Sequence, residues 1–458
     1  MKLATTPAPP ISATDLIGPT SDFSHYFLKA ARPSDRWAIG PEVELFGFTS
    51  DTFERIGLDQ VQSVMKGFSA EAVSCETEDG LIIEATLAEQ SEALSRVTIE
   101  PGGQIEFSGA HYPALARVER SLRDYIDRLS RIADTNGIIF IATGFDPLRS
   151  AQEQRWVPKQ RYKIMRPYLA SRGRKAWDMM DRTAAVQVNL DYSDLNDLAK
   201  KFAVANRLGP VVAAIFANSP LVEGKLSGYK STRYAAWLET DPDRTGLSPL
   251  ALEDDFSIER LVDYLRAVPM IFIRREGQYV DMRGRSFAQF VQNGAGGNGA
   301  GGAAIFQDFT DHLSALFTEA RLRPHIEQRS MDCGNLETVM AALALWKGLM
   351  YDRSSLARAL DIAPRLGRDD FARLQLEVAR HGLEARLDNI SVIDLAVEVL
   401  EIARTGLETI APDEARHLDL LYEQVVKEQL CAADILIRNF RGSWHGDARK
   451  AIEYLRIL

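Results

Sequence analysis

Glutamates set among strand-forming apolar residues constrain the fold of this chain more than any other feature. In residues 39–48, an extended backbone points Glu42 and Glu44 to one face and the neighbouring Val43 and Leu45 to the other. A buried carboxylate without a partner costs free energy, so both acids need cations nearby. The segment therefore predicts a strand with two acids that share one small volume, opposite a packed face.

A second acid-rich segment covers residues 98–107 and contains Glu100 and Glu106. The two acids are an even number of residues apart, which would put them on one face of a regular strand. The intervening Pro101-Gly102-Gly103 predicts a bulge or turn that breaks this register. Whether the two acids share an orientation is therefore open.

A third segment pairs Glu327 with Arg329, because residues two apart share one face of a strand. Arginine can hold a phosphoryl oxygen in fork geometry. Hard oxygen ligands such as these carboxylates suit Mg²⁺ or Mn²⁺, whose charge also neutralises phosphate oxygens. Alternatively, the carboxylates accept hydrogen bonds from arginine side chains or helix N-termini. The candidate metal-binding acids are Glu42, Glu44, Glu100, Glu106 and Glu327.

The composition indicates a soluble globular protein. The chain has 458 residues, 46% of them hydrophobic, enough for two or more packed units or one elaborated domain. It has no stretch of roughly 18 to 20 apolar residues and no apolar secretory block, so we expect a cytoplasmic protein that does not bind membranes. A net charge of −10 argues against nucleic-acid binding. Three widely spaced cysteines, Cys75, Cys333 and Cys431, predict free thiols.

Strand patterns lie almost entirely before residue 335, and helical periodicities recur after it. This order predicts an α+β fold in which helices are segregated to one side of an antiparallel sheet. We divide the chain into a mobile segment at 1–22, an α+β part at 23–334 and an all-helical part at 335–458 that packs on it. The glycine-rich residues 294–302 lack the ending of a phosphate-binding P-loop and are interpreted as a flexible connection or a lid.

Two further segments carry side chains suited to small charged ligands. Residues 149–182 hold ten Lys or Arg against three acids, which suits a small polyanion. Residues 231–246 place Arg233 and Trp237 in a short polar stretch, where arginine can clamp a carboxylate and tryptophan can wall a pocket. The alternative for each segment is a solvated surface stretch with scattered charge.

Two motifs are specific in combination, Glu-Pro-Gly-Gly-Gln at 100–104 and Val-Gln-Val-Asn-Leu-Asp at 186–191. With them, nearly the whole chain resembles the glutamate-cysteine ligases of the plant and proteobacterial type, in the superfamily of glutamine synthetase and the guanidino kinases. The resemblance implies a curved antiparallel sheet that forms the active site, with helices outside it, and makes 23–334 the catalytic domain. It also implies that ATP phosphorylates the γ-carboxylate of L-glutamate and that the amine of L-cysteine then displaces phosphate, the first step of glutathione biosynthesis.

The resemblance also assigns roles to residues of this chain. Those matched to metal-binding positions are Glu42, Glu44, Glu100, Glu106, Gln187 and Glu327. Those matched to the substrate region are Arg161, Arg166, Arg233 and Trp237, and those matched to nucleotide positions are Lys159, Asn189 and Arg329. Glu327 and Arg329 are also expected to act in phosphoryl transfer. The implied cofactor is Mg²⁺, or Mn²⁺, with ATP as co-substrate.

The first motif departs from the family pattern Gly-Thr-Glu-His-Glu-Lys-Phe-Gly-Phe, because Pro41, Val43 and Leu45 occupy its variable positions. Val43 and Leu45 should face away from the acids, so the departure should alter packing more than ligation. Other functions stay open: a ligase for another amino acid or amine, a non-catalytic binding homologue, or a guanidino-type kinase. The expected partners are ATP, L-glutamate and L-cysteine, bound by a monomer or a homodimer.

Overall fold

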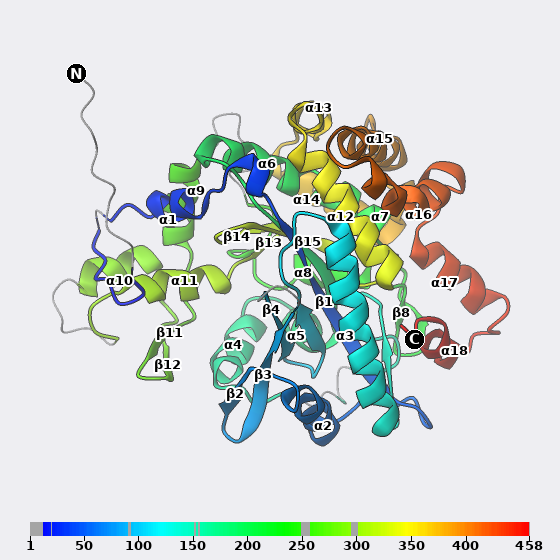
Figure 1. The fold of residues 1–458 in the computed structure, drawn as a ribbon, viewed down its shortest axis with the longest axis horizontal. Coiled ribbons are helices and arrows are strands. Elements are labelled where there is room, and N and C mark those ends of the chain that lie inside the picture. Colours follow the sequence, from blue (N-terminus) through cyan, green and yellow to red (C-terminus); the bar gives the residue numbers. More distant parts are fainter. Residues whose placement is uncertain are drawn as a thin grey trace.

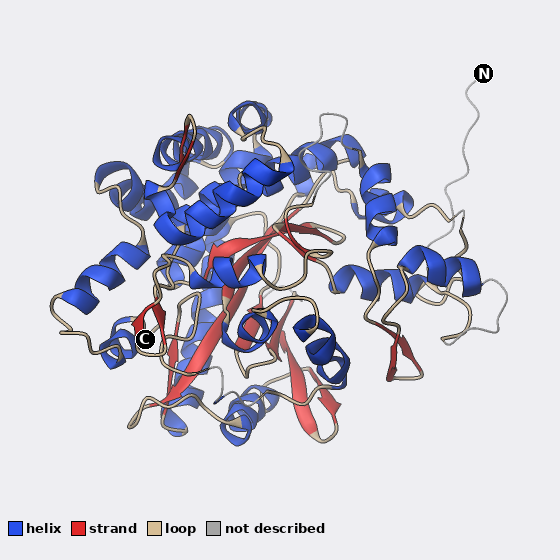
Figure 2. Ribbon diagram, turned by 180° about the vertical axis from the view of Figure 1, so that it is seen from behind, coloured by secondary structure: helices blue, strands red, loops and turns tan. Residues whose placement is uncertain are grey.

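An antiparallel sheet of nine strands runs through the middle of the molecule (Figures 1 and 2), which is described here as a computed structural model. The order is β14-β15-β7-β1-β5-β4-β3-β2, and β6 pairs with the rest of β1. Its strands are β1 (Ile39–Thr49), β2 (Ser74–Glu78), β3 (Leu81–Ala88), β4 (Leu94–Ile99), β5 (Ile105–Ser108), β6 (Ile138–Ile141), β7 (Ala185–Leu190), β14 (Ala320–Leu322) and β15 (Ile326–Asp332). The structure describes residues 12–19, 21–89, 93–150, 153, 156–248, 257–294 and 301–457.

Helices surround this sheet and small two-stranded ladders connect them (Figure 2). The helices before residue 335 are α1 (Ser24–Ala30), α2 (Leu58–Ser69), α3 (Leu115–Thr135), α4 (Gln160–Ala170), α5 (Ala176–Arg182), α6 (Leu195–Arg207), α7 (Gly209–Ile215), α8 (Thr232–Leu238), α9 (Ile258–Ala267), α10 (Phe287–Gly294) and α11 (Phe306–Ser314). Those after it are α12 (Leu336–Tyr351), α13 (Arg353–Ile362), α14 (Arg368–His381), α15 (Val392–Ile410), α16 (Asp419–Leu421), α17 (Ala432–Arg441) and α18 (Arg449–Tyr454). The ladders pair β8 (Leu221–Val222) with β9 (Lys225–Leu226), β10 (Thr245–Gly246) with β13 (Phe317–Thr318), β11 (Phe272–Arg275) with β12 (Gln278–Asp281), and β16 (Arg386–Leu387) with β17 (Ile390–Ser391).

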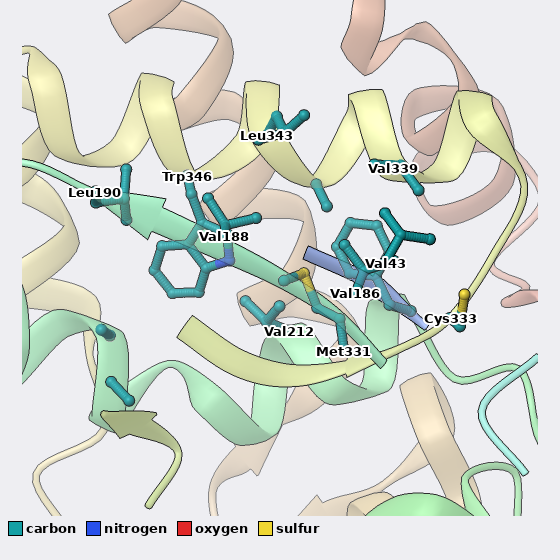
Figure 3. Packing of buried hydrophobic residues seen from close by; sticks show 14 of the residues in the cluster. Val43, Val186, Val188, Leu190, Val212, Met331, Cys333, Val339, Leu343 and Trp346 are labelled. Carbon is teal, nitrogen blue, oxygen red and sulfur yellow. The ribbon is translucent and has the colours of Figure 1, made fainter. Parts of the chain in front are cut away.

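The apolar face of the sheet packs against α12. Figure 3 shows Leu343 and Trp346 of this helix beside the strands that carry Val43 and Val188. All four side chains are buried, because alternation along β1 and β7 sends their apolar residues to this side and their polar residues to the other. Truncating a buried tryptophan such as Trp346 to alanine would cost about 3–5 kcal/mol. The same packing holds the polar residues of both strands in fixed positions.

Helix α12 is itself covered by α15, and a glycine makes their close approach possible. A Cβ on Gly348 would lie 2.1 Å from the backbone oxygen of Ala403, so any larger residue would push the helices apart. The N-terminus of α12 is capped by Asn335, whose side chain accepts a hydrogen bond from the backbone N–H of Thr338. These contacts attach the C-terminal helices to the sheet.

The structure confirms the α+β fold with an antiparallel sheet and C-terminal helices. Helix α3 is followed by β6, all of whose residues are buried. A tight turn at Glu276-Gly277 joins β11 to β12, and both of its residues have positive φ. One short element was not predicted: the β16–β17 ladder interrupts the otherwise helical C-terminal part.

Of the segment predicted to be mobile, residues 1–11 lie outside the described part of the chain. Within residues 12–19, the backbone N–H of Ile17 donates to Ala304, and that of Phe306 donates to Asp15. The predicted glycine-rich connection or lid lies mostly outside the described residues, which exclude 295–300. Among the helices that are described, none is both long and apolar enough to cross a membrane. All three cysteines are free thiols, as predicted.

Candidate active site

A cavity of about 340 Å³ opens on the polar face of the sheet. This volume lies in the range of small-molecule sites. Its lining includes side chains from the sheet strands β1, β2, β3, β4, β5, β7, β14 and β15, and residues from α4, α5, α8 and the β11–β12 ladder. The predicted site residues that line it are Glu42, Glu44, Glu100, Glu106, Lys159, Arg161, Gln187, Trp237 and Arg329. Segments far apart in the sequence therefore converge on one site.

The acids of β1 are held by amide groups of β7, the next strand in the sheet. Glu44 accepts hydrogen bonds from the side chain of Gln187 at 3.0 Å and from the backbone N–H of Ala185 at 2.9 Å. Glu42 accepts one from the side chain of Asn189 at 3.1 Å. Gln187 and Asn189 thus orient the two carboxylates.

The turn between β4 and β5 brings in the second pair of acids. Its backbone closes through hydrogen bonds from Glu100 to Gln104 and from Gly103 to Glu100, both 2.9 Å, and Gly103 has a φ of +79°. Glu106 then stands directly opposite Glu44 in the β1–β5 register. The predicted break at Pro101-Gly102-Gly103 is thus a turn, and both Glu100 and Glu106 still face the cavity.

Crowding raises the pKa values of these carboxyl groups. Burial, with the charges of Glu327 and Glu106, raises the pKa of Glu42 to about 7. Burial and the neighbouring Glu100 raise the pKa of Glu106 to about 7. Burial, Glu106 and Glu100 raise the pKa of Glu44 well above its usual range. Like charges within hydrogen-bonding distance of one another are a strong signal of a cation or proton site.

Glu327 accepts hydrogen bonds from arginine side chains, which was the alternative to metal binding considered for these carboxylates. Arg321 Nη2 donates to both of its oxygens, at 2.7 and 2.9 Å, and Arg329 donates to one of them. Burial acts to raise the pKa of the Glu327 carboxyl, but Arg321, Arg329 and Arg323 outweigh it and hold that pKa well below its usual range. Glu327 therefore anchors two arginines at the edge of the cavity.

The basic wall comes from the start of α4. Lys159 and Arg161 line the cavity, and burial lowers the pKa of the Lys159 ammonium while Glu100 opposes that shift. Arg166, five residues after Arg161, lies about 140° away around the helix axis. Its guanidinium pairs with Asp181 at 2.5 Å and does not line the cavity. The resemblance matched both arginines to the substrate region, and only Arg161 lines the cavity.

Arg233 lies behind Trp237, beside a smaller cavity of about 20 Å³ that Trp237 and Arg329 also line. Its Nη2 donates to the backbone oxygen of Arg329 at 2.7 Å, and its Nη1 is 4.0 Å from Asp332. Asp332 is fixed by the hydroxyls of Ser219 and Ser231, at 2.6 and 2.7 Å. Arg233 is thus buried next to the main cavity, beside Asp332, which two serine hydroxyls fix in place.

Several residues of the site were not predicted from sequence. The most informative is Arg321, which stands directly opposite Glu327 in the β14–β15 pairing. A signal for it existed, since apolar and charged residues alternate over 320–323 as in a strand, and Pro324 then marks a turn before Ile326. The other unpredicted residues with ionisable side chains in the wall are Glu76, Glu78, Glu84, Arg96, Tyr162, Arg274, Tyr279 and Arg323.

The acids fit a divalent cation by their chemistry, although they do not yet form a ligand cage. Among the described residues, no three acidic, histidine or cysteine side chains are grouped closely enough to hold an ion as they stand. Glu42, Glu44 and Glu106 are nevertheless hard oxygen donors whose mutual repulsion a cation would relieve. Rotation of their side chains, without any change of fold, is what coordination would require.

The antiparallel sheet presents carboxylates to one cavity that cationic side chains also line, which suits a small ligand with charges of both signs. A structure of glutamate-cysteine ligase from Francisella tularensis in complex with AMP has the same fold, with a TM-score of 0.56, 12% identity and coverage of 92% of this chain and 87% of that one. The chain belongs to glutamate-cysteine ligase family 2, whose model it matches over residues 38–454. It is thus an enzyme that uses ATP to form γ-glutamylcysteine, in the first step of glutathione biosynthesis.

Named relatives agree with this assignment. Glutamate–cysteine ligase B of Oryza sativa subsp. japonica is 34% identical over 423 residues, which are 92% of this chain and 84% of that protein. The glutamate–cysteine ligase of Arabidopsis thaliana is 34% identical over 437 residues, which are 95% of this chain and 81% of that protein.

The prediction of a cytoplasmic location is wrong in the light of these relatives, since the proteins from rice, tomato and Arabidopsis are all named chloroplastic. Apolar segments in a sequence indicate secretion or membrane spans. It carries no information about other compartments.

Proposed function

We propose that ligation takes place in the 340 Å³ cavity, with Mg²⁺ held on its acidic side by Glu42, Glu44, Glu100 and Glu106. When bound, the ion would neutralise the phosphate oxygens of ATP. Gln187 and Asn189 would keep the acids of β1 oriented through the hydrogen bonds that they already donate. Glu327 would act through Arg321 and Arg329, which it fixes beside the transferred phosphoryl group.

One observation carries this proposal: buried donors for which the described residues supply no partner line the cavity that holds the acids or, in the case of Arg233, lie next to it. In the part of the chain that is described, no hydrogen-bond partner exists for Arg161 Nε, Tyr162 Oη, Trp237 Nε1, or Nε and Nη1 of Arg233. Each such group costs about 1–3 kcal/mol when left unsatisfied. Anionic substrates would satisfy these donors, and a cation would satisfy the acids opposite.

The residues supply positioning and charge, as phosphoryl transfer between two anions requires. Lys159 and Arg161 would hold the phosphates of ATP, and Arg233 with Trp237 would hold the amino-acid substrate. Arg329 lies between the two groups, with its guanidinium 5.6 Å from the ring of Trp237. The γ-carboxylate of glutamate attacks the terminal phosphorus, ADP leaves, and the amine of cysteine then displaces phosphate and loses a proton.

The departures from the family's first motif do not touch this cavity. Val43 and Leu45 are 5% and 2% exposed and belong to the core on the other side of β1. The altered motif therefore changes packing behind the acids, as the alternation of side chains predicts. We infer that the residues around Trp237 set the choice of amine. There the chain keeps Arg233 and Trp237, which the resemblance matches to the substrate region.

ADP release with glutamate and a set of amines tests the proposal. Wild-type enzyme should require Mg²⁺ and should prefer L-cysteine to L-alanine and 2-aminobutyrate, and Glu44→Gln should lower kcat/KM at least about a hundredfold. Glu428→Gln removes an exposed acid outside the cavity and should leave the rate unchanged. Metal-independent turnover, or near-normal turnover by both Glu44→Gln and Glu106→Gln, would contradict the proposed site.

A further inference from the structure

Helix α8, which carries Arg233 and Trp237, is held by an acid that lies outside the main cavity. Glu319 follows β13 directly and is buried. It lines the smaller cavity of about 20 Å³ together with Arg233 and Trp237, and it does not line the main one. Glu319 therefore contacts the surroundings of both residues without reaching the space in which ligation is proposed.

Three neutral groups hold the carboxylate of Glu319. Tyr234 Oη of α8 and Gln375 Nε2 of α14 both donate to its Oε1 at 2.5 Å, and the Ser330 hydroxyl donates to its Oε2. Burial raises the pKa of the Glu319 carboxyl, and these hydrogen bonds, with the charge of Arg233, oppose that shift. Because a buried carboxylate is costly without such partners, its position and theirs are fixed together.

This acid is connected to Arg233 in three ways. Tyr234 is the next residue on α8, so fixing Tyr234 also fixes the backbone from which Arg233 projects. The charge of Glu319 acts directly on the Arg233 guanidinium. The backbone N–H of Arg329 donates to the backbone oxygen of Glu319 at 3.0 Å, and the backbone oxygen of Arg329 accepts from Arg233 Nη2 at 2.7 Å. Displacing Glu319 would therefore displace Arg233.

Helix α14 supports the same arrangement from the C-terminal part of the chain. The backbone oxygen of Ala379 accepts hydrogen bonds from the backbone N–H groups of Lys230 and Ser231, at 2.9 and 3.1 Å, just before α8 begins. Gln375 is buried one turn earlier on α14, and it donates to Tyr234 Oη at 3.3 Å as well as to the acid. Residues four apart share one face of a helix, so a single face of α14 holds both the start and the middle of α8.

We propose that Glu319 is a positioning residue of the ligase reaction, which fixes Arg233 and Trp237 for an amino-acid substrate, and that Gln375 makes the C-terminal helices part of this support. The inference rests on the proposed function, in which Arg233 and Trp237 hold that substrate. Neither Glu319 nor Gln375 touches the substrate itself. Their loss weakens binding of the amino acid and leaves binding of ATP unchanged, because the residues proposed to hold its phosphates lie at the start of α4.

Steady-state kinetics of the full-length enzyme with Glu319→Gln test this role. The variant keeps the size of the side chain and removes its charge, so it should raise KM for L-glutamate or L-cysteine at least about threefold and leave KM for ATP unchanged. Glu414→Gln removes the charge of another mostly buried acid, which lines neither cavity, and should leave the KM values of all substrates unchanged. Wild-type KM values for both amino acids in Glu319→Gln would overturn the proposal.

A double-variant cycle with Arg233→Lys separates a role through Arg233 from a general loss of stability. If Glu319 acts through Arg233, adding Glu319→Gln to Arg233→Lys should raise KM no further, whereas independent effects multiply and would refute the positioning role. Wild-type KM values in Arg233→Lys would refute the proposed substrate site and this inference with it. A raised KM in Arg233→Lys together with wild-type KM values in Glu319→Gln would refute only the role of Glu319.

Gln375→Met provides an independent test, which decides the matter if melting curves show that Glu319→Gln does not fold. It removes the donor to Glu319 and Tyr234 at a similar side-chain volume, and it should raise the same KM about threefold. Arg373→Gln changes an exposed residue of the same helix and should leave KM unchanged. A wild-type KM in Gln375→Met would contradict the support by α14 that the proposal includes.

Discussion

Replacing Glu42 by glutamine tests whether the negative charge of the active-site acids lowers the stability of the folded protein. Burial and the charges of Glu327 and Glu106 raise the pKa of Glu42 from 4.5 to about 7 in the folded protein. An acid with a raised folded-state pKa binds its proton more tightly when folded. Without metal, the stability that it contributes is therefore fully present below about pH 4.5 and is lost as the pH rises to about 7.

The magnitude follows from that interval. Since each pH unit corresponds to about 1.4 kcal/mol, the change from 4.5 to about 7 is worth about 3 kcal/mol of unfolding free energy above neutrality. An unfolding entropy of about 2.1 cal/mol/K per residue, taken over 458 residues, converts about 3 kcal/mol into about 3 °C of Tm. Glu42→Gln should therefore melt about 3 °C above wild type at about pH 8, and close to it at about pH 5.

Scanning calorimetry in EDTA and then in Mg²⁺ measures how the charge of Glu42 changes the Tm without metal and with it. In EDTA the difference in Tm between Glu42→Gln and wild type should grow with pH, and in Mg²⁺ it should shrink or reverse, because the ion stabilises only the intact acid set. Glu428→Gln, which removes an exposed acid, should show the same small difference at both pH values. A Glu42→Gln variant that is less stable than wild type at about pH 8 without metal would refute the reasoning.

Three other substitutions address the arginines and the turn. Glu327→Gln should destabilise the fold by about 3–5 kcal/mol, seen as a lower Tm, because it leaves Arg321 without its buried partner; an unchanged Tm would contradict the ion pair. Arg233→Lys should lower kcat/KM by about tenfold or more through a raised KM for an amino-acid substrate, since lysine lacks the planar fork, and an unaltered KM in steady-state assays would remove Arg233 from the substrate site. Gly102→Ala should cost about 1–3 kcal/mol in denaturant titrations, because its Cβ would lie 2.1 Å from the backbone oxygen of Asp181, and wild-type stability would show that the turn can shift.

Alternating patterns in the sequence were sufficient to predict much of the site. The period of two in β1 and β7 placed Glu42, Glu44 and Gln187 on the cavity side and Val43 in the core, because a strand's geometry relates neighbours directly. The same rule could not predict the orientation of Glu100, because this residue lies in a turn after the end of β4. Its position depends on how the turn closes, and the side-chain pattern does not encode that.

The partners of the charged groups could not be predicted, because they depend on contacts across strands and around helices. Glu327 meets Arg321 through the register of the β14–β15 pairing, and Arg166 meets Asp181 through the packing of α4 on α5. In both cases the sequence identified a charged residue but not which opposite charge it would find. An acid predicted to bind metal therefore holds an arginine, and an arginine predicted to bind substrate holds an acid.

The two sides of the active-site cavity are incomplete in complementary ways. Glu106 shares a repulsive environment with Glu42 and Glu44 on one wall, whereas near the other the described residues supply no partner for buried donors of Arg161 and Arg233. If the walls closed on each other, acids and arginines would neutralise one another, as Glu327 and Arg321 already do. The packed core behind β1 and β7 prevents this by holding the strands in place, so that the proposed metal-bound ATP, positive at its ion and negative at its phosphates, would complete both walls at once.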